Sequence, residues 1–395
     1  MERTSGSVFS LANIVSARAL LSFSYGFLNV LVSLYLHHIG YSFLTVGIIL
    51  GSAIVLSSSL TFLMAMLADH YGRKMVLVFL YLIFAVSSFV FLSSKDVSIL
   101  ILLSGLGSFT GSGGGPIGSG GPFGAVQTAL ITEFTDRSRF SRVLSTASAI
   151  GLISSSAGSF LIDVVERLDG NVFSLFYVAG FMGIIGMLIT VFLKDNGVKS
   201  SRLLPTISWK RMIKLSVPTI PNGIGAGFIS PIFSLWFHLR YGISSGEIGL
   251  IFGISNIFVL LPMLLIPRII KPESELSAIV WTRSASSILL IVLAFVTVPP
   301  LAAAVYIARQ GLQMGAVPVR QSFSMGIVDS TERATASGVT SMTRTGFSAA
   351  SPPVAGDLLS ISTIYPPLIG GIITAADPLL YYFLFRSSFG NRSGS

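Results

Sequence analysis

The chain has 395 residues, of which 52% are hydrophobic and only 10% are charged, and it contains no cysteine. Soluble domains carry about 25% charged residues, so this composition excludes an ordinary water-soluble protein. The missing cysteines exclude disulfides, zinc–thiolate sites and iron–sulfur clusters. The net charge of +9 could suit a nucleic-acid-binding protein, but in a chain this apolar the positive-inside rule explains it better. We therefore expect an all-α polytopic membrane protein with no nucleic-acid partner.

In chain order, twelve apolar segments are long enough to be membrane-spanning helices. They cover residues 12–36, 43–67, 75–93, 98–134, 143–163, 172–193, 215–238, 246–267, 277–298, 301–327, 335–361 and 364–386. Arginine and lysine gather in alternate loops, which places those loops and both termini in the cytoplasm. We expect a monomer in the plasma membrane, surrounded by the lipid bilayer.

The two halves of the chain resemble each other. The matches are residues 33–37 (SLYLH) with 234–238 (SLWFH), Gly47 and Gly51 with Gly249 and Gly253, and Gln127 with Gln321. Halves repeated in the same order predict two parallel repeats of six helices. The expected domains are residues 1–193 and 215–395, joined by a cytoplasmic linker at 194–214 that carries six basic residues.

A glycine-rich segment at residues 111–121 interrupts the fourth apolar stretch of the first half. The offset between the matching halves falls from 206 at Gly105 to 194 at Gln127, so the first half contains an insertion there. Irregular backbone at membrane depth is tolerated only against protein or a water-filled cavity. The segment is therefore either a flexible break that lines a substrate path or an insertion that bulges at a helix end.

The loop after the second apolar segment, residues 65–74, reads AMLADHYGRK. It resembles the signature loop of the major facilitator superfamily, G-x-L-A-D-x-x-G-R-K, with Ala65 in place of the first glycine. The resemblance implies twelve helices in two pseudo-symmetric six-helix bundles and transport by alternating access. It also implies a cytoplasmic gate made by Asp69, Gly72, Arg73 and Lys74, with Glu133 and Asp136 as available partners for Arg73. The alternative is that Arg73 and Lys74 only determine topology.

Ionisable residues inside apolar segments are functional candidates, because an uncompensated charge in the membrane is costly. Those in this chain are Arg18, Arg283, Arg309, Arg320, Arg344 and Asp377, with Asp357 near the end of a segment. We expect Arg320 and Asp377 to form an ion pair. The pair would be either a fixed structural link or a switch that protonation of Asp377 opens, and Asp357 is a second candidate for a proton site.

Uncharged polar residues add a second set of candidates. Tyr25 and Asn29 lie four residues apart, on one face of the first helix. The predicted substrate cavity is lined by Arg18, Tyr25, Asn29, Gln127, Asn222, Asn256, Arg309, Gln313, Arg320 and Gln321. For any one amide, the alternative is a hydrogen bond between two helices. His37 and His238 alone do not predict a metal site, and no pattern indicates a cofactor.

The function implied by the resemblance is secondary transport of a small organic molecule, with proton-coupled efflux as the first hypothesis. The alternative is a uniporter or symporter of a small organic anion, which would use Arg18, Arg309 and Arg320. A receptor or channel on a transporter-like scaffold is a third possibility. The sequence contains no nucleophile–base constellation, so an enzyme is not expected.

Overall fold

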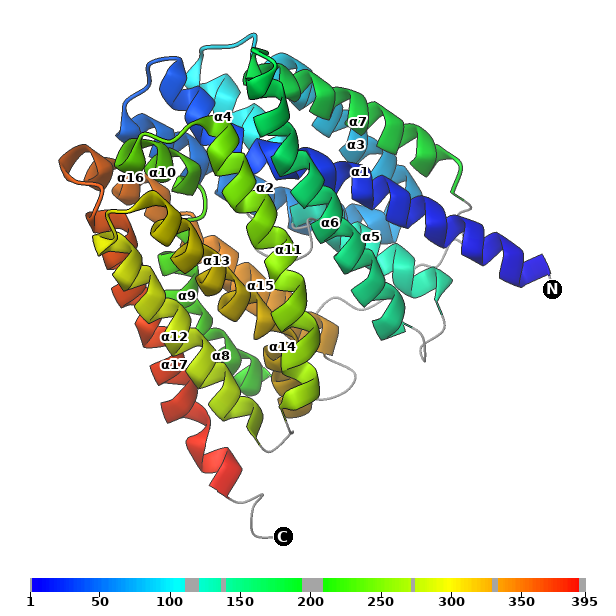
Figure 1. Cartoon of the computed structure of the whole chain (residues 1–395). Coiled ribbons are helices and arrows are strands. Elements are labelled where there is room, and N and C mark those ends of the chain that lie inside the picture. The colour runs from blue at the N-terminus through cyan, green and yellow to red at the C-terminus, as the bar shows by residue number, and fades with distance from the viewer. Residues whose placement is uncertain are drawn as a thin grey trace. The chain divides into compact units, whose positions relative to one another are not determined.

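The computed structural model describes residues 2–110, 121–135, 140–193, 209–270, 274–328 and 333–390, and within these ranges every regular element is a helix (Figure 1). Eight of the described helices are long and apolar enough to cross a membrane, and Val97–Leu106 is a shorter apolar helix. The other predicted spans are built from pairs of shorter helices.

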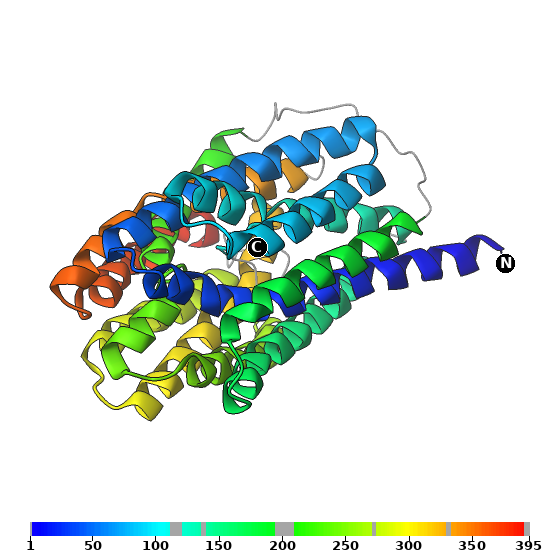
Figure 2. The same ribbon diagram turned by 90° about the horizontal axis from the view of Figure 1, so that it is seen from above.

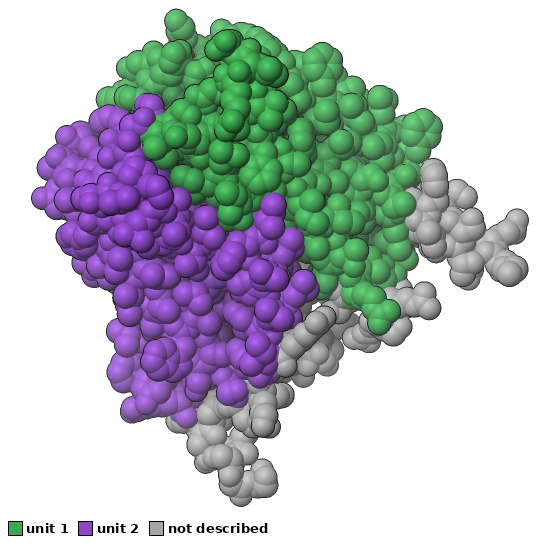
Figure 3. All heavy atoms as spheres, in the orientation of Figure 1, with its two compact units in different colours: residues 1–42, 52–201, 243–256 green, residues 43–51, 202–242, 257–395 purple. Residues whose placement is uncertain are grey.

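The chain divides into two compact units (Figure 3). The first unit comprises residues 1–42, 52–201 and 243–256, and the second comprises 43–51, 202–242 and 257–395. The expected domain boundaries around the 194–214 linker remain a prediction, and residues 194–208 lie outside the described ranges.

The helices of the first unit are those of the N-terminal part of the chain. They are α1 (Glu2–His38), α2 (Phe43–Tyr71, from residue 52 onward), α3 (Arg73–Phe91), α4 (Val97–Leu106), α5 (Gly121–Phe134), α6 (Phe140–Arg167), the 3-10 helix η1 (Val172–Ser174) and α7 (Leu175–Val191), and residues 245–256 of α11 belong to the same unit. Helix α4 begins where the Asp96 carboxylate accepts hydrogen bonds from two backbone N–H groups, which caps the helix. Helix α1 runs alongside α6 and α7 (Figures 1 and 2).

Glycine and serine bring α1 and α6 into close contact. The Ser159 hydroxyl donates a hydrogen bond to the Gly26 carbonyl oxygen at 2.9 Å. A Cβ atom on Gly158 would overlap the carbonyl oxygen of Phe23, and one on Gly26 would overlap that of Ser155. Small residues let helix backbones approach this closely, and they are the usual basis of helix association in lipid.

The second unit contains the remaining helices. They are α8 (Trp209–Ser216), α9 (Thr219–Gly227), α10 (Phe233–Tyr241), α11 (Ser245–Ile269, from residue 257 onward), α12 (Glu275–Phe295), α13 (Pro299–Gly315), α14 (Val317–Ile327), α15 (Arg333–Ser348), α16 (Ser351–Ile361) and α17 (Tyr365–Gly390). Helix α9 packs against α15 as closely as α1 packs against α6. A Cβ atom on Gly223 would overlap the carbonyl oxygen of Arg344, and one on Gly227 that of Ser348.

Four of the predicted spans are divided into two helices. The break in span 98–134 was expected and separates α4 from α5, although residues 111–120 lie outside the described ranges. Span 215–238 divides into α9 and α10, in line with the bend expected from its prolines and glycines. Spans 301–327 and 335–361 also divide, which was not anticipated. Prolines stand at the starts of α14 and α16, where the ring is tolerated because the first helical N–H groups have no partner.

The glycines repeated between the two halves have a packing reason. Within the second unit, a Cβ atom on Gly47 would overlap the carbonyl oxygen of Pro352. Within the first unit, a Cβ atom on Gly249 would overlap the carbonyl oxygen of Ser159. Gly47 and Gly249 thus each lie where two helix backbones meet.

Candidate functional site

The loop between α2 and α3 has the tight turn that its sequence predicts. Gly72 joins the two helices with a φ of 99°, a backbone conformation that favours glycine. Arg73 begins α3, and its Nη1 lies 3.3 Å from Glu133 Oε2 and 3.0 Å from the carbonyl oxygen of Ala129, both in α5. The side chain of Asp69 and the whole of Asp136 lie outside what the structure describes.

The Arg73–Glu133 pair is largely shielded from solvent, since the two side chains are 16% and 6% exposed. It ties the start of α3 to the end of α5 within the first unit. Lys74 is half-buried beside it. Partial burial reduces screening by water, so this pair should be stronger than a typical surface salt bridge.

The interior of the first unit contains a group of hydrogen-bonded polar side chains. The Gln127 amide donates to the Tyr81 hydroxyl at 3.1 Å, and both side chains are fully buried. The Tyr25 hydroxyl donates to the carbonyl oxygen of Gly107 at 3.2 Å. Arg18 is also buried and lies near enough to Tyr81 for their charges to interact. Three predicted cavity residues, Arg18, Tyr25 and Gln127, thus gather around α3.

Other predicted cavity residues make ordinary contacts between helices or lie apart. The Asn256 amide donates to the Ser155 hydroxyl at 3.2 Å in the first unit. In the second unit the Ser286 hydroxyl donates to the Gln313 side-chain oxygen at 2.9 Å. These two amides therefore follow the alternative interpretation, a link between helices. The remaining positions are Asn222, which is buried, Asn29, which is half-buried, and Gln321, which is exposed.

Asp377 pairs with Arg283, and the expected pair with Arg320 is wrong. Arg283 Nη1 and Asp377 Oδ2 form a salt bridge whose side chains are 5% and 0% exposed. The physical reason is helix packing: α17, which carries Asp377, lies along α12, which carries Arg283. The Arg283 guanidinium also lies over the Tyr381 ring, 5.8 Å from its centroid. Arg320 lies on another helix, α14.

Two more arginines lie close to this pair. The charges of Arg320 and Arg344 both act on Arg283, and Arg320 also acts on Arg344. We call these four residues, Arg283, Arg320, Arg344 and Asp377, the charged layer. Arg309 lies elsewhere, on α13, where it is buried and donates to its neighbour Gln310 at 3.1 Å. Asp357 is exposed on α16, and the groups whose charges act on Arg283 and Arg344 do not include it.

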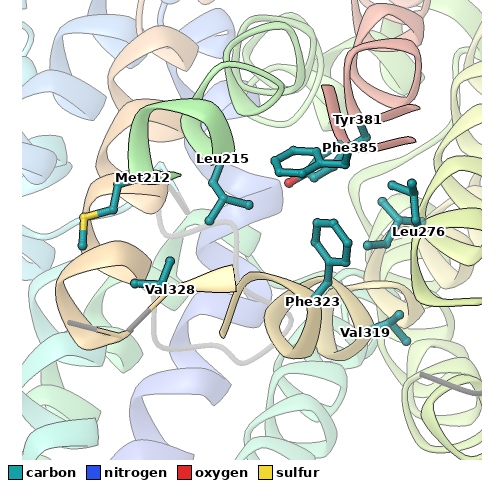
Figure 4. Close-up of a cluster of buried hydrophobic side chains, with 9 residues drawn as sticks. Met212, Leu215, Leu276, Val319, Phe323, Val328, Tyr381 and Phe385 are labelled. Carbon is teal, nitrogen blue, oxygen red and sulfur yellow. The ribbon is translucent and has the colours of Figure 1, made fainter. Parts of the chain in front are cut away.

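Figure 4 shows a cluster of buried apolar side chains in the second unit. It consists of Met212, Leu215, Leu276, Ile279, Val319, Phe323, Val328, Tyr381 and Phe385. Ile279 and Tyr381 each lie one helical turn from a member of the ion pair, on α12 and α17 respectively, and Phe323 lies one turn from Arg320 on α14. The cluster therefore closes one end of the charged layer with side chains that exclude water.

Comparison with known proteins identifies the family. The model of the Major Facilitator Superfamily matches residues 14–352, most of the chain. The chain belongs to the Major Facilitator Superfamily. The expected family and fold class are thereby confirmed, and the chain is a multi-pass membrane protein.

The individual proteins that resemble this chain share only a low sequence identity with it. The chain is similar to the quinolone resistance protein NorA of Staphylococcus aureus (strain MSSA476), with 26% identity over 243 residues, which are 58% of this chain and 59% of NorA. The match thus spans less than two thirds of that relative. The crystal structure of a mutant of the nucleoside transporter NupG aligns with a TM-score of 0.74 at 15% identity, covering 96% of this chain and 99% of NupG. A peptide transporter of the POT family aligns with a TM-score of 0.73 at 12% identity, covering 95% and 96%.

Tyr81 is not among the residues that the sequence predicts for the site, and Arg283 is predicted only as a charged candidate without a partner. Tyr81 connects Gln127 to the region of Arg18, and Arg283 is the partner of Asp377. Tyr81 carried no sequence signal beyond a polar group in an apolar helix. Arg283 did carry one, because it is an arginine inside a predicted span, but its depth alone did not show which helix it faces. Among the described residues, no group of three or more His, Asp or Glu side chains could hold a metal ion.

Proposed function

We propose that this chain exports small organic molecules across the plasma membrane by alternating access, as a monomer with both termini in the cytoplasm. The observation that supports it best is the charged layer, a buried salt bridge between two apolar helices with two further arginines near it. Charges at such depth are expensive in a bilayer and mark substrate or ion pathways. The direction of transport rests on the similarity to a protein named for quinolone resistance.

Contact with lipid is supported by the apolar surface of the helices. Large side chains such as Phe62, Phe181 and Trp281 are 57%, 58% and 76% exposed. Each projects from a helix with the length and hydropathy of a membrane span. In water such a surface would aggregate, whereas in a bilayer it replaces lipid–lipid contacts at little cost.

Proton coupling through Asp377 meets an electrostatic obstacle. Asp377 is paired with Arg283 on α12, and the charges that act on Arg283 are those of Arg320 on α14 and Arg344 on α15, with the Tyr381 ring also facing it. The Arg283 guanidinium stabilises the carboxylate, and protonation of Asp377 would leave that buried charge without its counterion. This observation favours the second candidate function, uniport or symport of a small organic anion.

The gate is a further part of the proposal. The Arg73–Glu133 pair holds the start of α3 to the end of α5, and the Asp69 loop lies directly before it. A partly buried pair of this kind contributes about 0.5–2 kcal/mol. That is enough to bias an equilibrium between two conformations whose free energies differ by a few kcal/mol.

Counterflow in proteoliposomes tests the function. Vesicles loaded with an unlabelled quinolone should accumulate the labelled quinolone transiently, because an alternating-access carrier exchanges substrate across the membrane. The assay is repeated with and without a pH gradient, and with cationic and anionic probes. Accumulation that depends on the gradient would support proton coupling, and accumulation of anions without a gradient would support the second candidate. Bulk ion current without counterflow would contradict the transporter mechanism and indicate a channel.

A further inference from the structure

The charged layer has an excess of positive charge. It contains three guanidinium groups and one carboxylate, so with ordinary protonation states its net charge is +2. The nearby Tyr381 contributes only the face of its ring. The apolar cluster one helical turn away supplies no counterion. Within the described part of the chain, the excess is therefore not neutralised by side chains.

The two arginines outside the salt bridge are the source of the excess. Neither Arg320 nor Arg344 has a side-chain hydrogen bond or ion pair among the described residues. Both are half-buried, so one part of each side chain is packed and another remains accessible. Arginine groups that are neither paired nor fully solvated repel one another, as the mutual action of Arg320 and Arg344 reflects.

The salt bridge itself is incompletely satisfied. The second carboxylate oxygen of Asp377, Oδ1, and the Nε of Arg283 are buried and have no hydrogen-bond partner. A buried ion pair is stable only when its other polar atoms are also bonded. The layer therefore has one unused donor, Arg283 Nε, and one unused acceptor, Asp377 Oδ1, besides its excess charge.

We propose that Arg320 and Arg344 bind the anionic oxygen atoms of a small organic substrate, while Arg283 stays paired with Asp377. This inference rests on the proposed transport function and specifies its substrate class, an organic carboxylate or phosphate. Guanidinium groups bind planar oxyanions through paired N–H donors, and such charge-assisted bonds are strong where water is scarce. The apolar cluster beside the layer limits the access of water from that end.

Thermal stability of the ligand-free protein in detergent gives a first test. If Arg320 and Arg344 are kept for a ligand, R320Q and R344Q should each raise the melting temperature or leave it unchanged, because the repulsion is removed. The matched control is R386Q, which removes an exposed arginine of α17 that lies over Phe383. A clear fall in melting temperature for both variants, with R386Q unchanged, would show a structural role and overturn the inference.

Binding of defined anions gives the second test. The probes are nalidixate, which is a quinolone carboxylate, its uncharged ethyl ester, benzoate and phenyl phosphate, each added to the purified wild-type protein. At least one anion should raise the melting temperature while the ester does not, and R320Q and R344Q should each weaken its binding about tenfold or more. The carboxylate and phosphate probes show which oxyanion is preferred. No effect of any anion on the wild type, or equal effects of nalidixate and its ester, would overturn the proposal.

Counterflow separates this inference from the proposed function. If the wild type exchanges the uncharged ester but ignores all the anions, transport stands and the anion site fails. If the wild type binds anions in an arginine-dependent way but exchanges no probe, the site stands and the transport function fails. In both cases R386Q reports any general effect of losing an arginine.

Discussion

In the interior of the first unit, the Gln127 amide donates to Tyr81 and Tyr25 donates to a backbone carbonyl, so these hydrogen bonds join neutral groups, whereas the Arg73–Glu133 pair lies at the ends of α3 and α5. In the second unit, the buried link between α12 and α17 is a salt bridge with two more arginines beside it. The repeat-related glutamines illustrate the divergence, because Gln127 is fully buried whereas Gln321 is exposed. The two halves therefore share close glycine-mediated helix contacts but differ in their buried polar groups. This difference suggests that a charged substrate would be bound by the second unit.

The largest expected effect comes from removing the Asp377 carboxylate. In D377A, Arg283 loses its only ion-pair partner among the described residues. Breaking one side of a buried pair costs about 3–5 kcal/mol, so D377A should lower the melting temperature strongly and reduce the yield of folded protein. The double variant R283M/D377L should recover much of this stability, because no charge is left unpaired. Asp357 is exposed, and D357N should change the stability by less than about 0.5 kcal/mol.

If D377A is as stable as the wild type, the Arg283–Asp377 salt bridge does not stabilise the second unit, and the two units do not differ in this respect. Thermal unfolding in detergent, followed by the loss of monodisperse protein, is the measurement. Recovery in the double variant excludes a simple defect of helix packing.

The next effect concerns the packing that both units share. In G158V the added side chain would overlap the backbone of Phe23, and in G223V it would overlap that of Arg344. Neither backbone can move away without separating two helices, so each variant should lose most of its folded yield in membranes. The matched control is G346A on α15, where a Cβ atom meets nothing within 4 Å. Similar losses for both valine variants would confirm the common packing plan, and a loss in one unit alone would contradict it.

A smaller effect is expected from the neutral network of the first unit. In Y81F the Gln127 amide loses its acceptor inside the protein, and an unsatisfied buried donor costs about 1–3 kcal/mol. The double variant Y81F/Q127L removes both polar partners and should be more stable than Y81F alone. Equal stability of the single and double variants would show that a water molecule replaces the lost hydrogen bond to Gln127. The interior of the first unit would then be accessible to water at this position. The double-mutant cycle is measured by thermal unfolding.

The sequence predicted those features of the structure that depend on a single helix and not on how helices pack together. Long apolar segments and the basic loops between them depend on the bilayer alone, and the repeated glycines at 47 and 249 revealed the duplication. The glycine-rich segment predicted the break before α5. The prolines at the starts of α14 and α16 carried a similar signal, but a proline can also kink a helix without dividing it.

The partner of Asp377 could not be predicted in the same way. Position along a helix gives the depth of a residue in the membrane, and both Arg283 and Arg320 have a depth compatible with pairing. The choice depends on which helices lie side by side and on how each is rotated about its axis. Those are properties of the packed bundle, and a single sequence gives no direct measure of them.

The smallest effect, and the one that extends the comparison to the gate, is expected for E133Q. The change keeps the shape of Glu133 but removes the charge that Arg73 contacts, so about 0.5–2 kcal/mol of ion-pair energy is lost. If the pair stabilises one conformation, its population relative to the other should change about 2- to 30-fold, since each 1.4 kcal/mol corresponds to a factor of ten. The chain contains no cysteine, so a single cysteine introduced near the α2–α3 loop can report accessibility by its rate of alkylation in membranes. K74Q is the control, because it removes a neighbouring charge without touching the pair. Equal alkylation rates in E133Q, K74Q and the parent would show that the Arg73–Glu133 pair only holds α3 to α5. The groups that control the conformational change would then have to lie in the second unit, with the charged layer.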